Sequence, residues 1–356
     1  MTPADSDAPA LDATVVEAPR LRQFTRLVFE KAGLRSADAQ LLADHLNWAD
    51  RRGISWLGVN KIPQYLERLR TGCTPADAEL SIVSDLPGFV LIDGHDAFGQ
   101  VVGYHAMKAA MAKARTAGAA VAVVRNTTSA GALGYFAALA ADERMIGLAM
   151  NNSAPLQPAV GGTAKVVGNQ AFAVGSPAAS HSPLVLDMAT SAITHARIHD
   201  YDNRGEPLPE GVALAANGAP TTDPAAALRG TLLPMAGHRG FGLALMWEVL
   251  TGVLGGGPRF SRNVTGPEEF DRPQGVSMFL LAVDPAPAMP HDTFTERVDQ
   301  LIDQVKAPGS TGPEPVRVPG ERSEQIRADR DRHGIPVPAA LFVRLRELGA
   351  ELGVTL

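Results

Sequence analysis

Short apolar segments alternate irregularly with helix-like segments along this chain, and this order strongly limits the folds open to it. The strand-like segments are bounded by turn residues and lie at 80–83, 89–92, 121–124, 146–150, 172–174, 184–186 and 276–283. The helix-like segments lie at 98–117, 132–141, 240–253, 294–305 and 338–352. Strands mixed with helices predict an α/β or α+β layer fold, and the irregular spacing argues against a regularly repeated βαβ array.

The amino-terminal part of the chain predicts a small helical unit that follows a loose tail. Apolar residues recur at helical spacing over 18–32, and further helical segments follow at 36–51 and 64–70. Residues 1–17 form an acidic segment rich in Ala and Pro, so we expect a disordered tail there. The helical unit is therefore expected over 18–75.

The remaining boundaries follow the change from helical to strand-like patterns. We expect a strand–helix connecting unit over 76–120, a mixed-sheet domain over 121–285 and a carboxyl-terminal helical segment over 286–356. Two stretches rich in Gly, Pro, Asn and Asp, 201–223 and 255–275, predict long loops. Loops of this length are usually functional or disordered.

Charge and cysteine content exclude several classes of partner and site. The net charge is −6 with no basic stretch, so neither nucleic acid nor an anionic membrane is expected as a partner. No segment approaches the roughly 20 apolar residues of a membrane span. Cys73 is the only cysteine, which excludes an intramolecular disulfide and a Cys-based metal site and fits a reducing cytoplasm. His195 and His199 lie in a polar run without a clear helical face, so no metal site is expected.

A glycine-rich turn is the strongest candidate for binding a nucleotide. No G-x-G-x-x-G sequence follows a strand, so the Rossmann fingerprint is absent. In Leu233-Pro-Met-Ala-Gly-His-Arg-Gly-Phe-Gly-Leu243, however, Gly237, Gly240 and Gly242 precede or open an apolar helix beside His238 and Arg239. Backbone N–H groups at a helix N-terminus bind anions, so this turn fits a diphosphate. Glycines needed only for close helix packing explain the same pattern equally well.

Two polar segments follow apolar strands. Asp187 ends the strand at 184–186 and either orients a catalytic group, holds a substrate amine or, as the preferred reading, caps the next segment beside Thr190 and Ser191. Asn151-Asn-Ser-Ala-Pro155 follows the strand at 146–150 and either lines a ligand crevice or forms a simple Asn/Pro turn. The isolated histidines, His45 among them, are expected to be surface or packing residues.

Together these segments resemble the malate/L-lactate dehydrogenase-like family, from about Phe24 to the carboxyl end. The resemblance depends on the order and spacing of several motifs, none of which is specific alone. They are Ala49-Asp-Arg-Arg-Gly53, Gly58-Val-Asn-Lys-Ile-Pro-Gln-Tyr65, Asn152-Ser-Ala-Pro155, Leu186-Asp-Met-Ala-Thr-Ser191, Gly218-Ala-Pro-Thr-Thr-Asp223, Leu233-Pro with Gly240-Phe-Gly-Leu243, and Pro319-Gly-Glu-Arg322.

The resemblance implies a non-Rossmann mixed sheet that binds NAD or NADP, flanked by helices, with a helical unit built from both chain ends. It also implies a homodimer with active sites near the subunit contact. Asp187 would lie at the reacting centre, and Lys61 would stand near a substrate carboxylate. The implied cofactor-binding residues are Asn152, Ser153, Pro155, Asn169, Gln170, Arg197, Gly237, His238, Arg239, Gly240 and Gly242.

The chain departs from the family where the family carries its proton-transfer chemistry. The family reads roughly R-G-x-D-S-H-G-V, and here the Ser-His pair is Trp56-Leu57. That histidine is the family's expected proton donor or acceptor, and leucine cannot transfer a proton. A second family histidine is replaced by Ser129, and the G-T-N-P segment has become 168–171, Gly-Asn-Gln-Ala. Two family lysines appear as Arg197 and Arg239.

These changes leave three hypotheses for function. In the first, the protein transfers hydride from NAD(P)H to a small C=N substrate, and Trp56 stacks on it. In the second, a lyase, cyclase or isomerase uses Asp187, His238 or Tyr65 as its acid–base group. The third is a pseudoenzyme with a binding or structural role. Trp56 and Leu57 would then merely fill an unused pocket.

Overall fold

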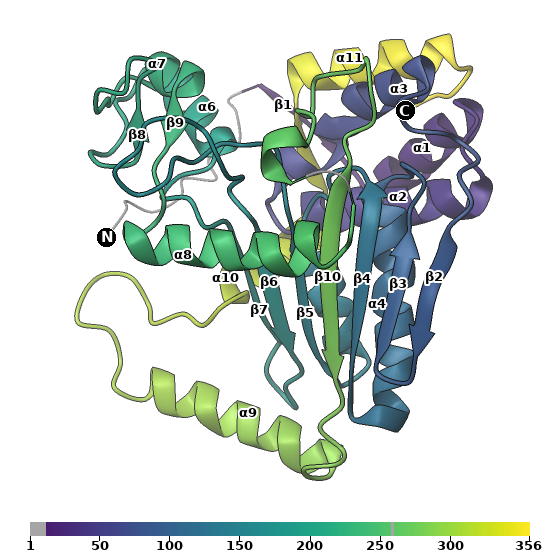
Figure 1. Cartoon of the computed structure of the whole chain (residues 1–356), viewed down its shortest axis with the longest axis vertical. Helices are drawn as coiled ribbons and strands as arrows, with labels where there is room; N and C mark the ends of the chain where they lie inside the picture. The colour runs from purple at the N-terminus through teal and green to yellow at the C-terminus, as the bar shows by residue number, and fades with distance from the viewer. Residues whose placement is uncertain (1–11, 258–259) are drawn as a thin grey trace.

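A seven-stranded sheet lies at the centre of the computed structural model, which describes residues 12–257 and 260–356 (Figure 1). Among its neighbouring strands only β3 and β4 run parallel, so the sheet is mixed and the predicted α/β class is confirmed. Its order is β2 (Ser81–Leu86), β3 (Phe89–Asp93), β4 (Ala119–Thr127), β10 (Val276–Val283), β5 (Ile146–Asn151), β6 (Phe172–Ser176) and β7 (Leu184–Met188).

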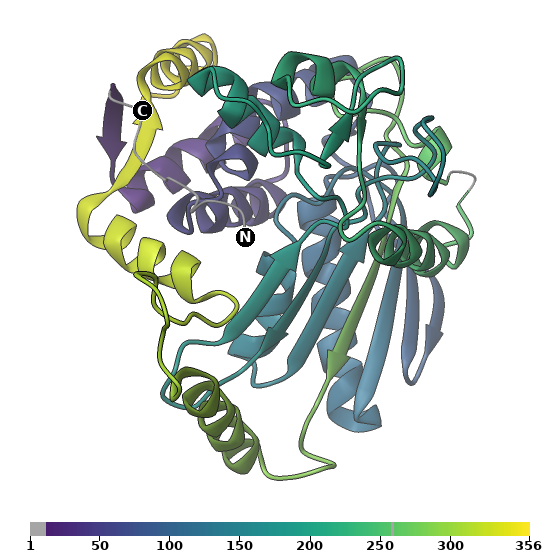
Figure 2. The ribbon, with the colours of Figure 1, turned by 90° about the vertical axis from the view of Figure 1, so that its left-hand side faces the viewer.

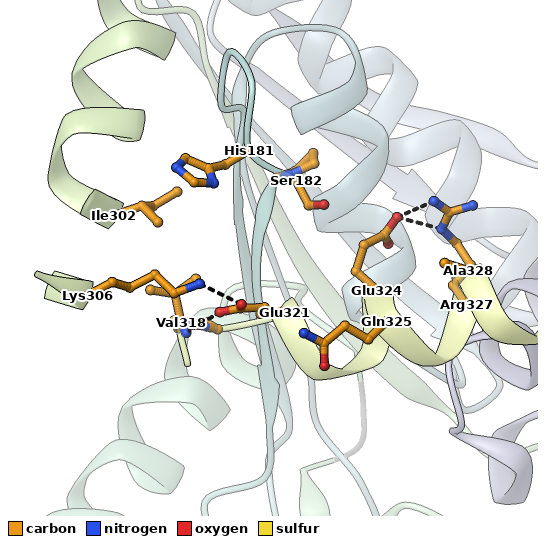
Figure 3. A pocket seen from close by; sticks show the side chains of 12 residues that line it. His181, Ser182, Ile302, Lys306, Val318, Glu321, Glu324, Gln325, Arg327 and Ala328 are labelled. Carbon is orange, nitrogen blue, oxygen red and sulfur yellow. Dashed lines mark hydrogen bonds and ion pairs between the residues drawn. The ribbon is translucent and has the colours of Figure 1, made fainter. Parts of the chain in front are cut away.

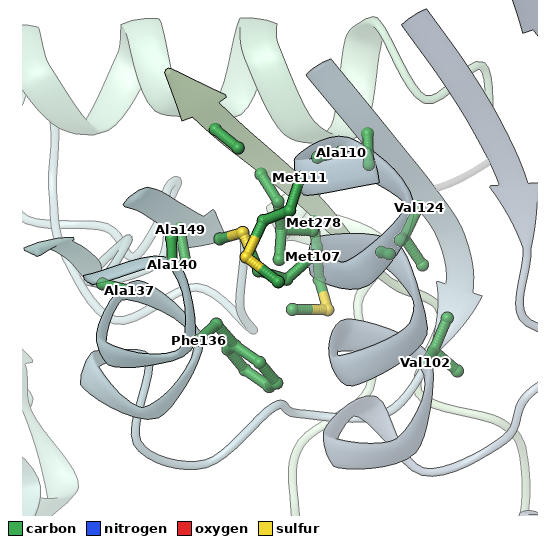
Figure 4. Packing of buried hydrophobic residues seen from close by; sticks show 14 of the residues in the cluster. Val102, Met107, Ala110, Met111, Val124, Phe136, Ala137, Ala140, Ala149 and Met278 are labelled. Atoms are coloured by element: carbon green, nitrogen blue, oxygen red, sulfur yellow. The ribbon is translucent and has the colours of Figure 1, made fainter. Parts of the chain in front are cut away.

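Two helices cover one face of the sheet and a third crosses the other. Helices α4 (Gly99–Ala117) and α5 (Gly134–Asp142) bury small and apolar residues against the strands, and Phe136 packs among methionines there (Figure 4). Helix α8 (His238–Glu248) crosses the opposite face and continues into the π-helical turn η3 (Val249–Val253) (Figure 1). No helix among the described residues is long and apolar enough to cross a membrane.

The predicted helical unit from both chain ends is confirmed and lies at one end of the sheet (Figure 2). Strand β1 pairs antiparallel with β11, although residues 13–16 were expected to belong to a disordered tail. The strand partner stands at the far end of the chain, so local sequence gave no sign of it. Residues 1–11 of that expected tail lie outside the described residues. The unit comprises β1 (Ala13–Val16), α1 (Ala18–Lys31), α2 (Ser36–Arg51), α3 (Ile62–Thr71), β11 (Ile335–Pro338) and α11 (Ala339–Glu351).

Two expected domain boundaries need correction. The unit predicted over 76–120 is not separate, because β2 and β3 hydrogen-bond into the main sheet and α4 packs on it. Helix α9 (His291–Lys306) does not pack back on the helical unit with the rest of the carboxyl-terminal segment. Its Asp299 carboxylate instead accepts N–H bonds from Ala179 at 3.0 Å and Ser180 at 2.8 Å, at the β6–β7 turn.

Several elements lie where the sequence predicted polar loops. Helix α6 (His195–Arg204) covers the supposed polar run, and the Thr194 hydroxyl caps it by accepting the Arg197 N–H at 3.2 Å. With α7 (Pro224–Arg229), β8 (Ala213–Leu214) and β9 (Thr231–Leu232) it forms a small lobe with its own apolar core. Helix α10 (Glu321–His333) was missed because it is polar on all sides and has no buried residue.

The close contact between α5 and β6 yields a stability prediction. A Cβ at Gly175 would lie 2.4 Å from the Ala137 carbonyl oxygen. Because α5 must shift to admit it, Gly175→Ala should lower the free energy of unfolding by about 1–3 kcal/mol in urea denaturation. Gly312→Ala, whose Cβ would meet nothing within 4 Å, is the control and should change stability by less than about 0.5 kcal/mol. Equal stability of the two variants would contradict a tight α5–sheet contact.

Candidate functional site

A cleft of about 650 Å³ opens between the helical unit, the edge strand β7 and the lobe of α6. One wall is the turn after α2, residues 52–56, and the opposite one is formed by 317–326, which leads into α10. Strand β7, residues 189 and 191–194 after it, and Arg197, Asp200 and Tyr201 of α6 supply most of the remaining lining. The charged residues that line the cleft are Arg52, Arg197, Arg317, Arg322, Asp187 and Asp200, so cations outnumber anions in a chain of net charge −6.

Asp187 stands on β7 and opens into this cleft, where its side chain is accessible to solvent. Protein encloses the carboxyl on its other sides, and this burial raises its pKa to about 6 against the opposing effect of a hydrogen bond from Gly134. The Gly134 N–H donates to Oδ2 at 2.7 Å. A Cβ at Gly134 would lie 3.0 Å from both Asp187 Oδ2 and Trp48 Cη2, so only a glycine lets the carboxyl and the indole meet there. The preferred reading of Asp187 as a cap of the following segment is therefore replaced by a cleft-facing role.

Trp56 lines the cleft and keeps 43% of its surface exposed. A side chain that merely filled an unused pocket would be buried, so the structure argues against that reading. Leu57, which the resemblance places at the family histidine, is not among the residues that line the cleft. Beside Trp56, the Arg52 guanidinium stacks 4.3 Å above the Trp48 ring and pairs with Glu324 at 3.1 Å.

No histidine is among the described residues that line the cleft. His45 is fully buried on α2, where its Nε2 accepts the Ala132 N–H at 3.0 Å and burial lowers its pKa to about 3. It is the packing residue that the sequence predicted. Within the described chain no group of three or more His, Cys, Asp or Glu side chains is placed to hold a metal ion.

The glycine-rich turn adjoins the cleft but does not line it. Gly237 has a φ of +62° and precedes α8, which begins at His238. A Cβ at Gly240 would lie 2.4 Å from the Met235 carbonyl oxygen, so this glycine serves close packing. At Gly242 a Cβ would meet nothing within 4 Å, and His238 and Arg239 are exposed. Close packing therefore accounts for Gly240, and the diphosphate site at this turn stays a prediction.

Asn152 and Gln170 lie behind the surface of the site. Both side chains are fully buried and donate to the buried Glu248 carboxylate, Asn152 at 3.0 Å. The Gln170 amide oxygen also accepts the Ser153 N–H at 3.0 Å, and the Ser153 hydroxyl donates to Asn169 at 3.2 Å. Asn152 and Gln170 therefore shape the loops that carry Ser153, Asn169 and Pro155 and do not face a ligand directly.

Three other predicted residues lie outside the cleft lining. Tyr65 is buried in the helical unit and accepts a hydrogen bond from Gln100 at 2.8 Å; burial raises its pKa to about 12. It is a packing residue and not an acid–base group. Lys61, in the short helix η2 (Val59–Lys61), is partly buried, which lowers its pKa. The Ser129 N–H donates to Gln274 at 3.0 Å.

Sequence reasoning missed several residues that shape the cleft. Glu248 was taken as an ordinary residue of an apolar helix, and Trp48 and Arg52 were noted only as part of helical or family segments. The resemblance motif at Pro319-Gly-Glu-Arg322 was the one signal for the opposite wall, which Pro319 and Arg322 line. None of these roles follows from local pattern, because each depends on contacts between distant segments.

The fold is a mixed sheet without a Rossmann unit, and comparison with known proteins identifies its family. Residues 16–346 match the family model described as malate/L-lactate dehydrogenase. A malate dehydrogenase of Pyrococcus horikoshii is 33% identical over 97% of this chain and 98% of its own length. The Δ1-pyrroline-2-carboxylate/Δ1-piperideine-2-carboxylate reductase of Pseudomonas putida is 32% identical over 94% and 98% of the two chains. The solved sulfolactate dehydrogenase of Methanocaldococcus jannaschii has a TM-score of 0.90 at 31% identity, covering 96% and 98%.

The chain therefore belongs to the malate/L-lactate dehydrogenase family, and it is an oxidoreductase of that family. The resemblance inferred from the motifs is confirmed.

The raised pKa of Asp187 predicts how its replacement changes stability with pH. Folding makes this carboxyl harder to ionise, so its contribution to stability falls as pH rises from about 4 to about 6. Asp187→Asn, whose amide oxygen still accepts the Gly134 N–H, removes that loss. The variant should gain on wild type by about 1 kcal/mol above pH 6, a value reduced by solvent access to the cleft, and nothing below pH 4.

Urea denaturation of both proteins across this pH range measures the difference. A constant gap would contradict a raised pKa at Asp187.

Proposed function

We propose that this protein uses NAD(P)H to reduce the C=N bond of a small cyclic imino acid. The observation that carries the proposal is the Asp187 carboxyl, which opens into a cleft lined by indole side chains and by no described histidine. Reduction of a 2-oxo acid needs a positioned acid to protonate the carbonyl oxygen, and its loss costs about 10²–10⁴-fold in rate. An iminium already carries its proton.

The cleft suits a cationic C=N group at the reacting centre. Hydride adds to the iminium carbon, the π electrons move to nitrogen, and a neutral amine results without a further proton. The Asp187 carboxylate stabilises the iminium charge, and below its raised pKa the same carboxyl can donate a proton to a neutral imine. The exposed face of Trp56 supplies a cation–π surface.

The arginines of the cleft are the groups that bind a substrate carboxylate. Arg197 comes from α6, and Arg317 and Arg322 come from the opposite wall. Guanidinium groups bind carboxylates through paired hydrogen bonds and fix their orientation. A substrate with one carboxylate beside its C=N bond thus finds both kinds of partner in one cleft.

The turn at 237–242 fits the diphosphate of the cofactor. The turn lies at the positive end of the α8 dipole, the space beside Gly242 is open, and His238 and Arg239 are exposed nearby. Bound NAD(P)H would supply the hydride. Thr190 connects the two regions, since its N–H donates to Asn169 at 2.8 Å and its carbonyl accepts the Met235 N–H at 2.9 Å.

Similarity to the Pseudomonas putida protein supports this substrate class, because that relative is named for two cyclic imino acids. The second candidate function is a non-redox reaction with Asp187 as the acid–base group. The observation that favours it is the pKa of about 6, which lies near the range of an efficient general base.

We also propose that the protein is a cytoplasmic homodimer. Large apolar side chains stay exposed along α8, η3 and the residue that follows it. They are Leu245, Met246, Val249, Val253 and Leu254, with exposed fractions of 41–54%. A row of this kind on the surface marks a protein contact, and the family resemblance supports a second copy as the partner.

The substrate proposal predicts a clear preference. With NADH or NADPH, Δ1-piperideine-2-carboxylate should be reduced at least about 10²-fold faster than pyruvate or oxaloacetate, because only the 2-oxo acids need the missing acid. The measurement is the loss of nicotinamide absorbance, with fluorescence titration of each cofactor beside it. Brisk malate or lactate oxidation would contradict the proposal, and tight cofactor binding without imine turnover, or no cofactor binding, would favour the non-redox candidate.

The dimer proposal predicts the effect of charge on the apolar row. Leu245→Asp with Val253→Asp should halve the mass measured by light scattering after size-exclusion chromatography. Leu301→Asp on α9, where Leu301 is 54% exposed, is the matched control and should leave the mass unchanged. A monomeric wild type, or a dimer that survives the double substitution, would refute this assignment.

A further inference from the structure

The cleft wall that carries Trp56 has little core of its own. Residues 55–57 form the short helix η1 (Ser55–Leu57), in which no residue is buried. Trp56 nevertheless faces the cleft with an exposed indole. Because η1 buries no residue, contacts with neighbouring segments must hold it in one conformation.

Asp50 supplies a contact from below. It stands in the last turn of α2 with 1% of its surface exposed, and its Oδ2 accepts the Val59 N–H at 2.8 Å. Burial raises its pKa to about 7, with the Val59 bond and the Arg330 charge acting in the opposite direction. Burying an ionisable carboxyl costs free energy, so such a residue is rare unless hydrogen bonds or charges compensate for the burial.

Gly58 shows how closely the carboxyl presses on the chain. A Cβ at this position would lie 2.0 Å from Asp50 Oδ1, closer than any side chain tolerates. Asp50 therefore touches the backbone at residues 58 and 59, directly after Trp56 and Leu57. The end of this turn cannot move without breaking both contacts.

Arg330 ties the same turn to the opposite wall. This residue of α10 donates from Nη1 to the Asp50 carbonyl oxygen and to the Ser55 hydroxyl at 3.2 Å. Helix α10 has no buried residue, and a hollow of about 340 Å³ lies on its far side, lined by Glu321, Glu324 and Gln325 among others (Figure 3). Polar bonds such as Arg51 with Asp331 at 2.6 Å thus hold this wall in place.

We propose that Asp50 is a positioning residue that holds Trp56 in the cleft, through its carboxyl contacts at Gly58 and Val59 and the Arg330 bond to its carbonyl. Through Arg330 it also sets the spacing between the two walls. Its effect on substrate binding rests on the proposed imine reductase function. Its effect on the position of Trp56 does not depend on that function.

The test compares Asp50→Ala, Asp50→Asn and the control Asp292→Asn, whose parent residue pairs with Arg144 at the start of α9 and not in the cleft. The first readout is acrylamide quenching of Trp56, defined as the component absent from Trp56→Phe. Asp50→Ala should change this component, whereas Asp50→Asn keeps an oxygen for the Val59 N–H and should retain it. Asp292→Asn should match wild type.

The second readout is kinetics with Δ1-piperideine-2-carboxylate. Asp50→Ala should raise KM about tenfold with kcat within about twofold, because substrate binding is lost and the chemistry is not. Asp50→Asn should restore most of the KM. Altered quenching in a protein without imine turnover would support the positioning role and refute the proposed function.

Gly58→Ala keeps the test decisive if Asp50→Ala folds poorly. Alone it should lower Tm and change Trp56 quenching, since the new Cβ displaces the carboxyl. In the double variant with Asp50→Ala the steric conflict disappears, so Tm should recover in part while quenching stays altered. Unchanged quenching and KM in every folded variant, with only Tm lowered, would show that Asp50 is purely structural and overturn the proposal.

Discussion

The hydrogen bond from the Gly134 N–H to Asp187 joins the start of α5 to the edge strand β7, and the cleft depends on it. α5 packs closely on the sheet through small residues, and this packing fixes the distance between its first turn and β7. Gly134 thereby lies close to both the carboxyl and the Trp48 ring, and the carboxyl opens into the cleft. Burial and this bond act on its pKa in opposite senses, and burial prevails.

The cleft and the glycine-rich turn are separate surfaces joined by the segment after β7. Thr190 bonds to the loop of Asn169 on one side and to Met235 on the other. The buried Glu248 carboxylate organises the same loop from below through Asn152 and Gln170. A substrate in the cleft and a diphosphate at α8 would therefore be placed relative to each other by backbone bonds, which suits hydride transfer between two bound molecules.

The structure places some predicted site residues in the cleft and others in the core, and the difference depends on the sequence feature behind each prediction. Trp56 lies in the cleft as the replaced motif position predicted, whereas Asp187 was read from its strand end as a cap and lies in the cleft as the resemblance implied. Tyr65 fell within the family motif but points into the core of the helical unit. Asn152 and Gln170 are polar residues beside a turn, yet their partner Glu248 comes from α8, far along the chain. Helix α10 has no apolar period, so only the motif at 319–322 indicated the wall it forms.

The sequence by itself determined the mixed α/β class, the helical unit at the chain ends and the family. These properties depend on hydrophobic periodicity and on the order of motifs, and both can be read from the sequence without knowledge of tertiary contacts. Only the tertiary structure decided that Trp56 is exposed to the cleft while Leu57 is not among its lining residues, and that Asp50 and Arg330 lie beneath this turn. Such placements arise from contacts between segments far apart in the chain, and their steric and electrostatic terms exist only once the chain has folded.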